Sequence, residues 1–499
     1  MESTCANNSP RLWCERSVIT ISAFSRTGEQ TRTSNETRTC FHQMFIYASV
    51  TSQSSAFPVS SSFYVDKKAT PGSSPHRMKL RCVICCLFLL SSSGVLLMLS
   101  VKYSNVTEYF PPSASSESHP IYQKYNINCQ AIYDLDPAEV GKSMVIRRKH
   151  VVENQEETLV NLTSNCSLFI KSRGYDDVCV SEGERDFPLA YSLVVHKSAV
   201  MVERLIKAVY TPRNIYCIHY DQKSPPLFIS AMEGLARCLP NVFIASKRES
   251  IFYGGISRLK ADLNCLSDLL ASEVKWKYVI NLCGQDFPLR SNIELVSELR
   301  RLNGANMLET SRPTTLKMQR FILHHELRDA NFEYKKMPVK TDQRKIPPPH
   351  GIKVFSGNAY FILSRDFVAH LDSSAAVKDF LAWSEDTFSP DEHFWATLAR
   401  LPGVPGEVAR TEPDITDLQS RTRLVKWEYL EGSLYPPCSG KHVRSVCIYG
   451  AAELRWLLNY GHWFANKFDL QVDPVVVQCL EEKLEEKRRL FQSVACREG

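Results

Sequence analysis

The sequence has neither of the glycine-rich motifs that most often cradle phosphate groups, GxGxxG and GxxxxGK[ST]. Beyond residue 128 it also has no CxxC pair, which argues against a zinc site. The chain also has no large excess of either charge. It contains 60 Lys and Arg residues and 54 Asp and Glu residues, which gives a net charge of +6. No basic stripe indicates a nucleic-acid partner.

One apolar run stands out against this mixed composition. Residues 82–101 carry no charge, and their length is about what crosses ~30 Å of hydrocarbon as a helix. Arg77, Lys79 and Arg81 precede the run, whereas only Lys102 closely follows it, and such an excess keeps the preceding side in the cytosol. The pattern predicts a single-span type II membrane protein. A cleaved signal peptide is the alternative, although its apolar core is usually only ~7–15 residues long.

The chain on either side of this run divides by composition. We expect a cytosolic tail over 1–81, in which residues 1–77 are rich in Ser, Thr and Arg. These 77 residues are predicted to be disordered, or to be an extension ahead of a natural start at Met78. A Ser/Pro-rich stem is predicted over 102–127, a folded lumenal body over 128–488 and a short tail over 489–499.

Cysteines and glycosylation sequons agree with a lumenal body. The chain has 17 cysteines, and those from Cys129 onward are an odd number in an environment where thiols usually pair. At least one thiol should therefore stay free or pair between chains. Three of the sequons in the chain, which begin at Asn105, Asn161 and Asn165, lie beyond the apolar run and mark candidate glycosylation sites.

The body has the alternating pattern of an α/β fold. Apolar runs over 188–195, 214–220, 242–245 and 276–283 predict strands. Amphipathic stretches over 199–210, 225–238, 257–270 and 291–302 predict helices, the last with a capping box of Ser291 and Glu294. Such alternation predicts a mostly parallel sheet covered on both faces, with ligands beyond the carboxyl ends of its strands. His196, Asp221 and Gly284-Gln285-Asp286 then lie at the site edge, unless they are ordinary polar loop residues.

A diphosphate could be neutralised in two ways. Asp134 and Asp136 form an Asp-x-Asp that could hold a divalent cation, but they precede the α/β pattern and more readily fit a surface turn. Arg444 and Lys467 are the other candidates, because each is a cation within an apolar stretch. Structural ion pairs are the alternative for both.

The stretch 389–397 and the aromatic pair after it have two interpretations each. Ser389, Pro390 and Glu392 fit the N-cap, N1 and N3 positions of a helix, so Glu392 could complete a capping box. A helix start facing a cleft can equally carry a general base. Trp427 and Tyr429 could form a platform for a sugar ring or belong to the core.

The body resembles the β1,6-N-acetylglucosaminyltransferases that branch mucin-type O-glycans. The matching segments are 190–196, 215–221, 261–265, 276–288, 303–310, 389–397, 424–429 and 442–450. The resemblance implies a glycosyltransferase A-type fold, a Rossmann-like mixed sheet with helices on both faces. It implies a single-span Golgi protein that transfers GlcNAc from UDP-GlcNAc, with inversion and no metal, to O6 of the GalNAc in core 1, Galβ1-3GalNAc-Ser/Thr. Mucin-type O-glycoproteins would be the acceptors, and a homodimer is left open.

The resemblance also implies a role for individual residues. Glu392 corresponds to the catalytic base. The residues that contact the UDP-sugar would be Val194, His196, Asp221, Tyr253, Arg444 and Lys467, with the last two replacing a metal ion at the diphosphate. The acceptor pocket would contain Glu309, Lys317, Arg320, Trp427 and Tyr429. Implied disulfides are Cys129–Cys479, Cys166–Cys238, Cys217–Cys265 and Cys438–Cys447, with Cys283 free and Cys179 and Cys496 undecided.

Two alternative functions stay open at this point. Within the same enzyme class, the acceptor could be poly-N-acetyllactosamine (I-branching) or core 3, which gives core 4. In a different class, the chain could be a catalytically silent Golgi glycan-binding protein, although an intact set of Glu392, Arg444 and Lys467 argues for activity.

Overall fold

The computed structural model describes residues 122, 124–150, 155–330, 335–409 and 420–495, all within one compact unit, Ser116–Gly499. The predicted cytosolic tail, the predicted membrane span, most of the predicted stem and the Asn105 sequon lie outside the described residues. Within the described ranges, no helix has both the length and the apolarity needed to cross a membrane. From Tyr122 onward, the end of the predicted stem packs against the body, where the Tyr125 backbone N–H donates to Gln478 Oε1 at 2.9 Å.

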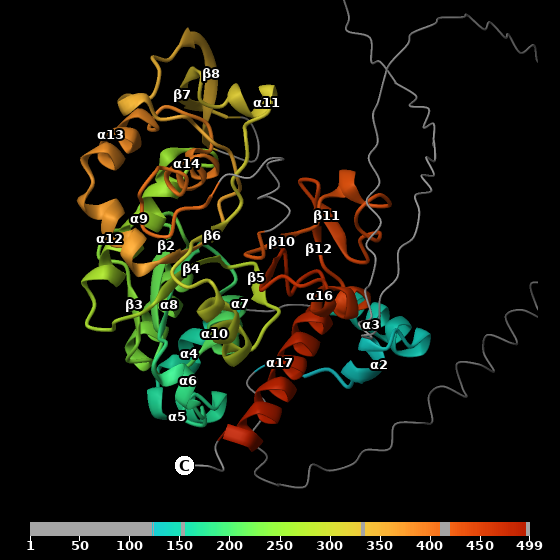
Figure 1. Ribbon diagram of the computed structural model, residues 1–499. Coiled ribbons are helices and arrows are strands. Elements are labelled where there is room, and N and C mark those ends of the chain that lie inside the picture. The colour runs from blue at the N-terminus through green and yellow to red at the C-terminus, as the bar shows by residue number, and fades with distance from the viewer. Residues whose placement is uncertain (1–121, 123, 151–154, 331–334, 410–419, 496–499) are drawn as a thin grey trace, which may run out of the picture. The chain divides into compact units, whose positions relative to one another are not determined.

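A six-stranded mixed sheet forms the centre of the unit (Figure 1). Its parallel strands are β1 (Leu189–Val195), β2 (Ile215–Tyr220), β3 (Val242–Ile244) and β4 (Tyr278–Cys283), in the order β3-β2-β1-β4. Beyond β4, strand β9 (Phe361–Ser364) runs antiparallel to both β4 and β6 (Met307–Leu308). The four strands predicted from apolar runs are therefore confirmed.

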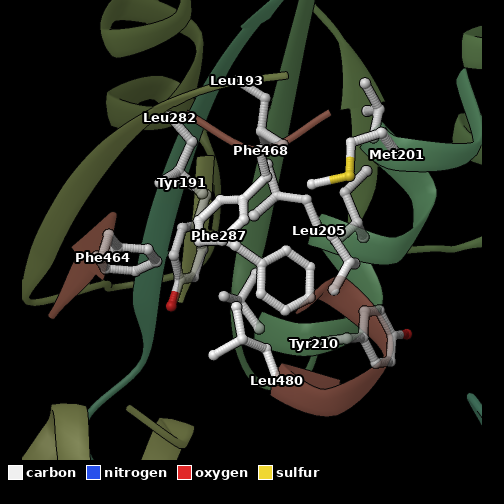
Figure 2. Close-up of a cluster of buried hydrophobic side chains, with 14 of the residues drawn as sticks. Tyr191, Leu193, Met201, Leu205, Tyr210, Leu282, Phe287, Phe464, Phe468 and Leu480 are labelled. Carbon is white, nitrogen blue, oxygen red and sulfur yellow. The ribbon is translucent and has the colours of Figure 1, made fainter. Parts of the chain in front are cut away.

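Helices cover both faces of this sheet, as predicted. They include α7 (Ala199–Val209), α8 (Pro226–Cys238), α9 (Ile256–Ala271) and α10 (Asn292–Arg301), which begins with the predicted Ser291–Glu294 capping box. Side chains alternate across β1, so Tyr191 and Leu193 join one apolar cluster and Ala190 joins a second one with α9. Figure 2 shows the first cluster, in which Leu193 and Phe287 lie beside Met201 and Leu205 of α7.

Further elements surround the sheet. The helices are α2 (Cys129–Tyr133), α3 (Pro137–Lys149), α4 (Gln155–Thr163), α5 (Cys166–Arg173), α6 (Glu182–Arg185), α11 (Thr315–Met318), α12 (Arg365–Ser373), α13 (Ala375–Trp383), α14 (Phe394–Leu398), α16 (Leu454–Asn459) and α17 (Pro474–Ala495). Strands β10 (Leu424–Val425), β13 (Phe464–Asn466) and β5 (Asp286–Pro288) form a small sheet. Two antiparallel hairpins are formed by β7 (Leu323–Asp329) with β8 (Lys336–Arg344), and by β11 (Lys441–Val443) with β12 (Val446–Ile448). Single 3₁₀ turns are Pro349–Gly351, Pro390–Glu392, Glu428–Leu430 and Ala451–Glu453.

The four disulfides implied by the resemblance are present: Cys129–Cys479, Cys166–Cys238, Cys217–Cys265 and Cys438–Cys447. Cys283 is free, as expected, and Cys179 is disulfide-bonded, which the sequence had left undecided. Cys496 lies outside the described residues. Asn161 and Asn165 are exposed, so their side-chain amides are accessible to solvent.

Candidate active site

The carboxyl ends of the parallel strands carry the polar residues that the sequence placed there. His196 follows β1 and Asp221 follows β2, so both lie at the same edge of the sheet. The Asp221 carboxylate accepts hydrogen bonds from the backbone of Lys223 (2.9 Å) and of Ile251 (3.3 Å). It also pairs with Lys223 Nζ at 3.0 Å. Asp221 therefore anchors the loop that leads to Tyr253, whose side chain is exposed.

Two other residues predicted near this edge are buried. Val194, the next-to-last residue of β1, is only 6% exposed. Asp286 is fully buried in β5, where it accepts a hydrogen bond from the Cys283 backbone at 2.7 Å and pairs with Arg423 at 3.3 Å. Asp286 therefore follows the carboxyl end of β4, as predicted, but its carboxylate is buried and already paired inside the protein.

Lys467, Arg444 and Lys197 interact electrostatically near the same edge of the sheet. Burial lowers the pKa of Lys467, and the positive charges of Arg444 and Lys197 lower it further. The pKa of His196 is also lowered, first by desolvation and then by Lys197, with Arg444 acting in the same direction. Cations that repel one another favour a bound anion, which relieves their repulsion. Sequence reasoning missed Lys197, although its place at the end of a strand was an available signal.

Arg444 is presented by an unusual turn. Arg444 and Ser445 join β11 to β12 with φ angles of +52° and +56°. Hairpins of this kind favour Asn-Gly, so a non-glycine pair here is strained and has to be held by its surroundings. The Ser445 carbonyl accepts a hydrogen bond from the Glu428 backbone at 2.9 Å. This bond ties the turn to the segment that carries Trp427 and Tyr429.

Glu392 does not cap a helix, so the predicted capping box is wrong. Pro390–Glu392 form a single 3₁₀ turn, and Ser389 has a φ of +46° and makes no side-chain cap. The Ser389 backbone instead donates to the Gly254 carbonyl at 2.7 Å, a contact distant in sequence that sets this conformation. The Glu392 carboxylate forms an ion pair with Arg320, and each side chain is 34% exposed. Glu392 is therefore partly open to solvent.

A buried carboxylate stands next to Glu392 in the chain. The pKa of Asp391 is raised to about 6 because burial disfavours its charge. Arg258 opposes this rise, whereas the charge of Glu392 adds to it. Arg258 is held by Asp262 of α9, and Asp262 also accepts a hydrogen bond from Ser192 Oγ at 3.1 Å. A buried charged network from β1 and α9 thus supports the turn that carries Glu392.

The predicted acceptor residues also gather in one place. Glu309 accepts a hydrogen bond from Asn358 Nδ2 at 2.7 Å and lies 3.9 Å from Lys317 Nζ. The Trp427 and Tyr429 rings are 5.7 Å apart, and both are exposed, so their assignment to the core is wrong. Desolvation raises the pKa of Tyr429, and the Glu309 charge raises it further, which places these two side chains near each other. Exposed rings beside a carboxylate suit a sugar ring with its hydroxyls.

Gly357 contacts the backbones of Glu309 and Glu392, and no pattern in the sequence indicated this role. Its backbone N–H donates to the Glu392 carbonyl at 2.8 Å. A Cβ at Gly357 would lie 2.0 Å from the Glu309 carbonyl oxygen and 3.2 Å from Ala396 Cβ. Only glycine allows this approach. The backbones of Glu309 and Glu392 are therefore fixed against the same residue.

A series of contacts connects the cations to the carboxylate. The Arg444 guanidinium lies 5.4 Å from the centre of the Tyr253 ring, and that ring lies 6.5 Å from the Phe388 ring. The Arg320 guanidinium lies 5.5 Å from the Phe388 ring and pairs with Glu392. The predicted donor and acceptor residues therefore surround one region.

The described residues offer no convincing metal site. Asp134 and Asp136 form the expected exposed turn, where Asp136 caps α3 by accepting from the Glu139 backbone at 2.9 Å. Two groups of potential ligand atoms occur among the described residues, but both include Cys438, which is bonded to Cys447. A disulfide sulfur is not the thiolate that a metal requires.

Comparisons with known proteins agree with this geometry. Residues 189–458 match the family model described as "Branch: Core-2/I-Branching enzyme". A Danio rerio protein named "Beta-1,3-galactosyl-O-glycosyl-glycoprotein beta-1,6-N-acetylglucosaminyltransferase 4" is 66% identical, over 72% of this chain and 85% of its own. A Mus musculus protein of the same name is 59% identical, over 78% of this chain and 85% of its own. A Homo sapiens protein has the same name without the number. It is 43% identical, over 72% of this chain and 86% of its own. The chain therefore belongs to the Core-2/I-Branching enzyme family of glycosyltransferases.

Proposed function

We propose that this protein transfers GlcNAc from UDP-GlcNAc, in β1,6 linkage, to the GalNAc of core 1 O-glycans on mucin-type glycoproteins. The observation that carries the proposal is the contact series from Arg444 to Glu392, which connects a cationic residue to a partly exposed carboxylate. The printed names of the relatives describe the same transfer on β-1,3-galactosyl-O-glycosyl-glycoproteins. The strand order β3-β2-β1-β4 with antiparallel β9 supports a glycosyltransferase A-type fold.

Glu392 is the general base of the proposed reaction. Its carboxylate takes the proton of the GalNAc 6-hydroxyl as that oxygen forms a bond to the anomeric carbon of GlcNAc. The bond from that carbon to the diphosphate breaks on the opposite face, so UDP leaves and the configuration inverts. Arg320 pairs with the Glu392 carboxylate before the acceptor arrives. A partly exposed ion pair is worth only ~0–1 kcal/mol, so the acceptor hydroxyl can displace it at little cost.

The diphosphate is held by protein cations in place of a metal ion. Arg444, Lys467 and Lys197 already act on one another, so negative charge that develops on the departing UDP is stabilised without rearrangement. Tyr253 lies beside Arg444, and Asp221 anchors the loop that carries it. Together with His196 and Val194, these residues form the proposed donor side.

The acceptor glycan rests on the predicted acceptor residues. Trp427 and Tyr429 supply exposed rings for a sugar face, and Glu309 and Lys317 supply polar partners for its hydroxyls. Holding the 6-hydroxyl against Glu392 supplies the orientation that speeds a two-substrate reaction.

We further propose that the protein is a single-pass type II protein of the Golgi membrane with a lumenal catalytic domain. The uncharged run 82–101 and its basic flank support this topology. The disulfides of the body are typical of an oxidising compartment.

Replacing Glu392 by Gln in the full-length protein tests the catalytic assignment. Gln has nearly the same size but cannot accept a proton at neutral pH, so turnover should fall by ~10²–10⁴-fold. Because Glu392 caps no helix, the melting temperature and UDP binding should stay near those of the unchanged protein. Glu385→Gln is the matched control, since Glu385 is another exposed carboxylate in an ion pair, with Lys260. A folded Glu392→Gln variant with near-normal turnover would remove Glu392 from the mechanism.

Acceptor choice is tested by offering core 1, core 3 and lactosamine acceptors with UDP-GlcNAc and identifying the linkage formed. We expect β1,6 transfer to core 1 at the highest kcat/KM. Preferred transfer to lactosamine or core 3 would replace the core 1 assignment by I-branching or core 4 synthesis. Glycan binding without transfer would favour a silent glycan-binding protein.

A further inference from the structure

The net charge of the chain is concentrated in one segment. Residues 312–353 contain ten Lys and Arg residues against four Asp and Glu residues, a net charge of +6. The whole chain has the same net charge of +6, so the rest of it is neutral overall. This segment contains β7 and β8.

The hairpin of β7 and β8, with Lys345 directly after it, is here called the basic hairpin. Besides Arg328, its exposed cations are Lys335, Lys336, Lys340 and Arg344, and none of these four has an ion-pair partner among the described residues. Its described carboxylates are fewer. Glu326 is paired with Arg328 at 2.8 Å, Asp329 lies opposite Lys336 in the ladder, and Asp342 is exposed. A surplus of positive charge therefore faces solvent.

The basic hairpin is joined directly to the candidate active site. Its first strand begins shortly after Arg320, the partner of Glu392. The His325 backbone donates to the Asp386 carbonyl at 2.9 Å, and the Asp386 carboxylate pairs with Lys345 and His324. Figure 1 shows β7 and β8 beside α11, the short helix that carries Lys317.

The positive charges of the basic hairpin and of Arg320 act on two histidines. Burial lowers the pKa of His325, and the charges of Lys340 and Lys345 lower it further. The pKa of His393 is lowered to about 3 by burial, with added contributions from Arg320 and Lys345. Lys345 thus acts on both histidines, so the hairpin and the acceptor side of the site share one electrostatic environment.

We propose that the basic hairpin binds acidic residues of the acceptor polypeptide, next to the glycosylated Ser or Thr. The inference rests on the proposed function, because it assigns a partner to the acceptor side of that site. The nine residues of β8 extend over ~30 Å at ~3.3 Å per residue, which is the scale of an extended peptide and far beyond a disaccharide. Opposite charge steers such a peptide and favours its binding.

The test uses full-length protein in detergent and glycopeptides of one length, each with Galβ1-3GalNAc on a single Thr. The flanking residues are Glu and Asp in one peptide, Gln and Asn in the second and Lys in the third. Free core 1 disaccharide is the fourth acceptor. Transfer is measured as kcat and KM, and binding is measured separately by fluorescence anisotropy of labelled peptides.

Two double variants are compared with the unchanged protein. Lys340→Glu with Arg344→Glu reverses two exposed charges of the basic hairpin. Lys275→Glu with Lys277→Glu is the matched control, because these exposed lysines precede β4 and so lie at the opposite edge of the sheet from the strand ends that carry the site.

We expect the acidic glycopeptide to have the lowest KM in the unchanged protein. Two exposed ion pairs correspond to about a 2- to 30-fold preference over the neutral peptide. High salt should remove the preference, because it screens exposed charges. The hairpin variant should lose or reverse the preference, the control variant should keep it, and kcat with the free disaccharide should stay unchanged in both.

Several results would overturn the inference. Equal KM and equal binding for the acidic and neutral peptides would show that the exposed lysines only keep the strand edges from pairing with other chains. Loss of disaccharide transfer in the hairpin variant would show a structural role. Charge-dependent binding to vesicles of anionic lipid, without any peptide preference, would assign the hairpin to a membrane surface. Charge-dependent peptide binding without transfer to core 1 would support the inference and refute the proposed reaction.

Discussion

Gly357→Ala should disable the enzyme through the backbone, without removing any reactive group. The added Cβ would lie 2.0 Å from the Glu309 carbonyl oxygen and 2.9 Å from its carbonyl carbon. Contacts under 3.0 Å essentially do not occur for real Cβ atoms, so the two segments must move apart by about 1 Å. The neighbour is backbone, so a change of side-chain rotamer cannot relieve the clash.

The expected size of the effect follows from this displacement. Overpacking of this kind typically costs ~1–3 kcal/mol of the free energy of unfolding, which lowers the melting temperature by a few degrees. The Gly357 N–H also holds the Glu392 carbonyl at 2.8 Å, so the shift moves the proposed base relative to Glu309. A misplacement of ~1 Å at a reacting centre can cost ~10²-fold in rate.

The assay measures transfer to core 1, UDP binding by calorimetry and thermal unfolding. We expect turnover to fall ~10²-fold and UDP affinity to stay close to normal, because the atoms nearest to the added Cβ belong to Glu309 and Ala396, and not to Arg444 or Lys467. Gly141→Ala is the control, since nothing lies within 4 Å of its added Cβ in helix α3. That variant should be neutral or up to ~1 kcal/mol more stable.

A second variant identifies the atom responsible. Adding Ala396→Gly to Gly357→Ala removes the lesser contact at 3.2 Å but leaves the Glu309 carbonyl in place, so activity should not return. If Ala396→Gly restored activity, the damaging clash would be with Ala396 and not with the Glu309 carbonyl. A Gly357→Ala protein with normal melting and normal turnover would show that the close approach to Glu309 is not required.

Three further predictions follow from other parts of the structure. Activity should persist in excess EDTA if protein cations take the role of a metal ion, as we propose, and Lys467→Met should then lower kcat by ~10²–10³-fold; a collapse in EDTA that Mn²⁺ restores would contradict this. The pKa of Asp391 is raised from about 3.8 to about 6, so the cost of burying its charge is absent below pH ~4 and complete above pH ~6. Asp391→Asn should therefore gain stability over the unchanged protein as the pH rises from 4 to 7, by up to ~3 kcal/mol, and a difference independent of pH would be evidence against this environment. Replacing both Cys217 and Cys265 by Ala should lower the free energy of unfolding by ~2–5 kcal/mol, measured by denaturant titration under non-reducing conditions. Equal stability would mean that the disulfide between β2 and α9 hardly constrains the unfolded chain.

Sequence patterns predicted the structure correctly where interactions between residues a few positions apart decide it. The apolar run around β1 is buried on both faces, and its alternation sends neighbouring residues into different clusters. Helix α10 begins at the predicted capping box because Ser291 and Glu294 are only three residues apart and bond to each other's backbone. The disulfides needed the family resemblance, since wide spacing allows many pairings.

Local reasoning failed where a distant contact overrides it. Ser389, Pro390 and Glu392 have the right residue types for a capping box, but the Gly254 carbonyl binds the Ser389 backbone and holds it at a φ of +46°. Asp286 looked like a loop residue at the sheet edge, but Arg423 from much later in the chain neutralises it in the interior. In each case the deciding partner is far away in sequence.

By itself, the sequence determined the α/β core, the order of its first strands and helices, and the residue types available for chemistry, because burial periodicity and capping act over a few residues. Only the tertiary structure decided which of those residues meet. Arg444, Tyr253, Arg320 and Glu392 come from four separate parts of the chain, and Gly357 from a fifth. Their assembly depends on how the loops at one end of the sheet pack together, and no local pattern encodes the distance between two such loops.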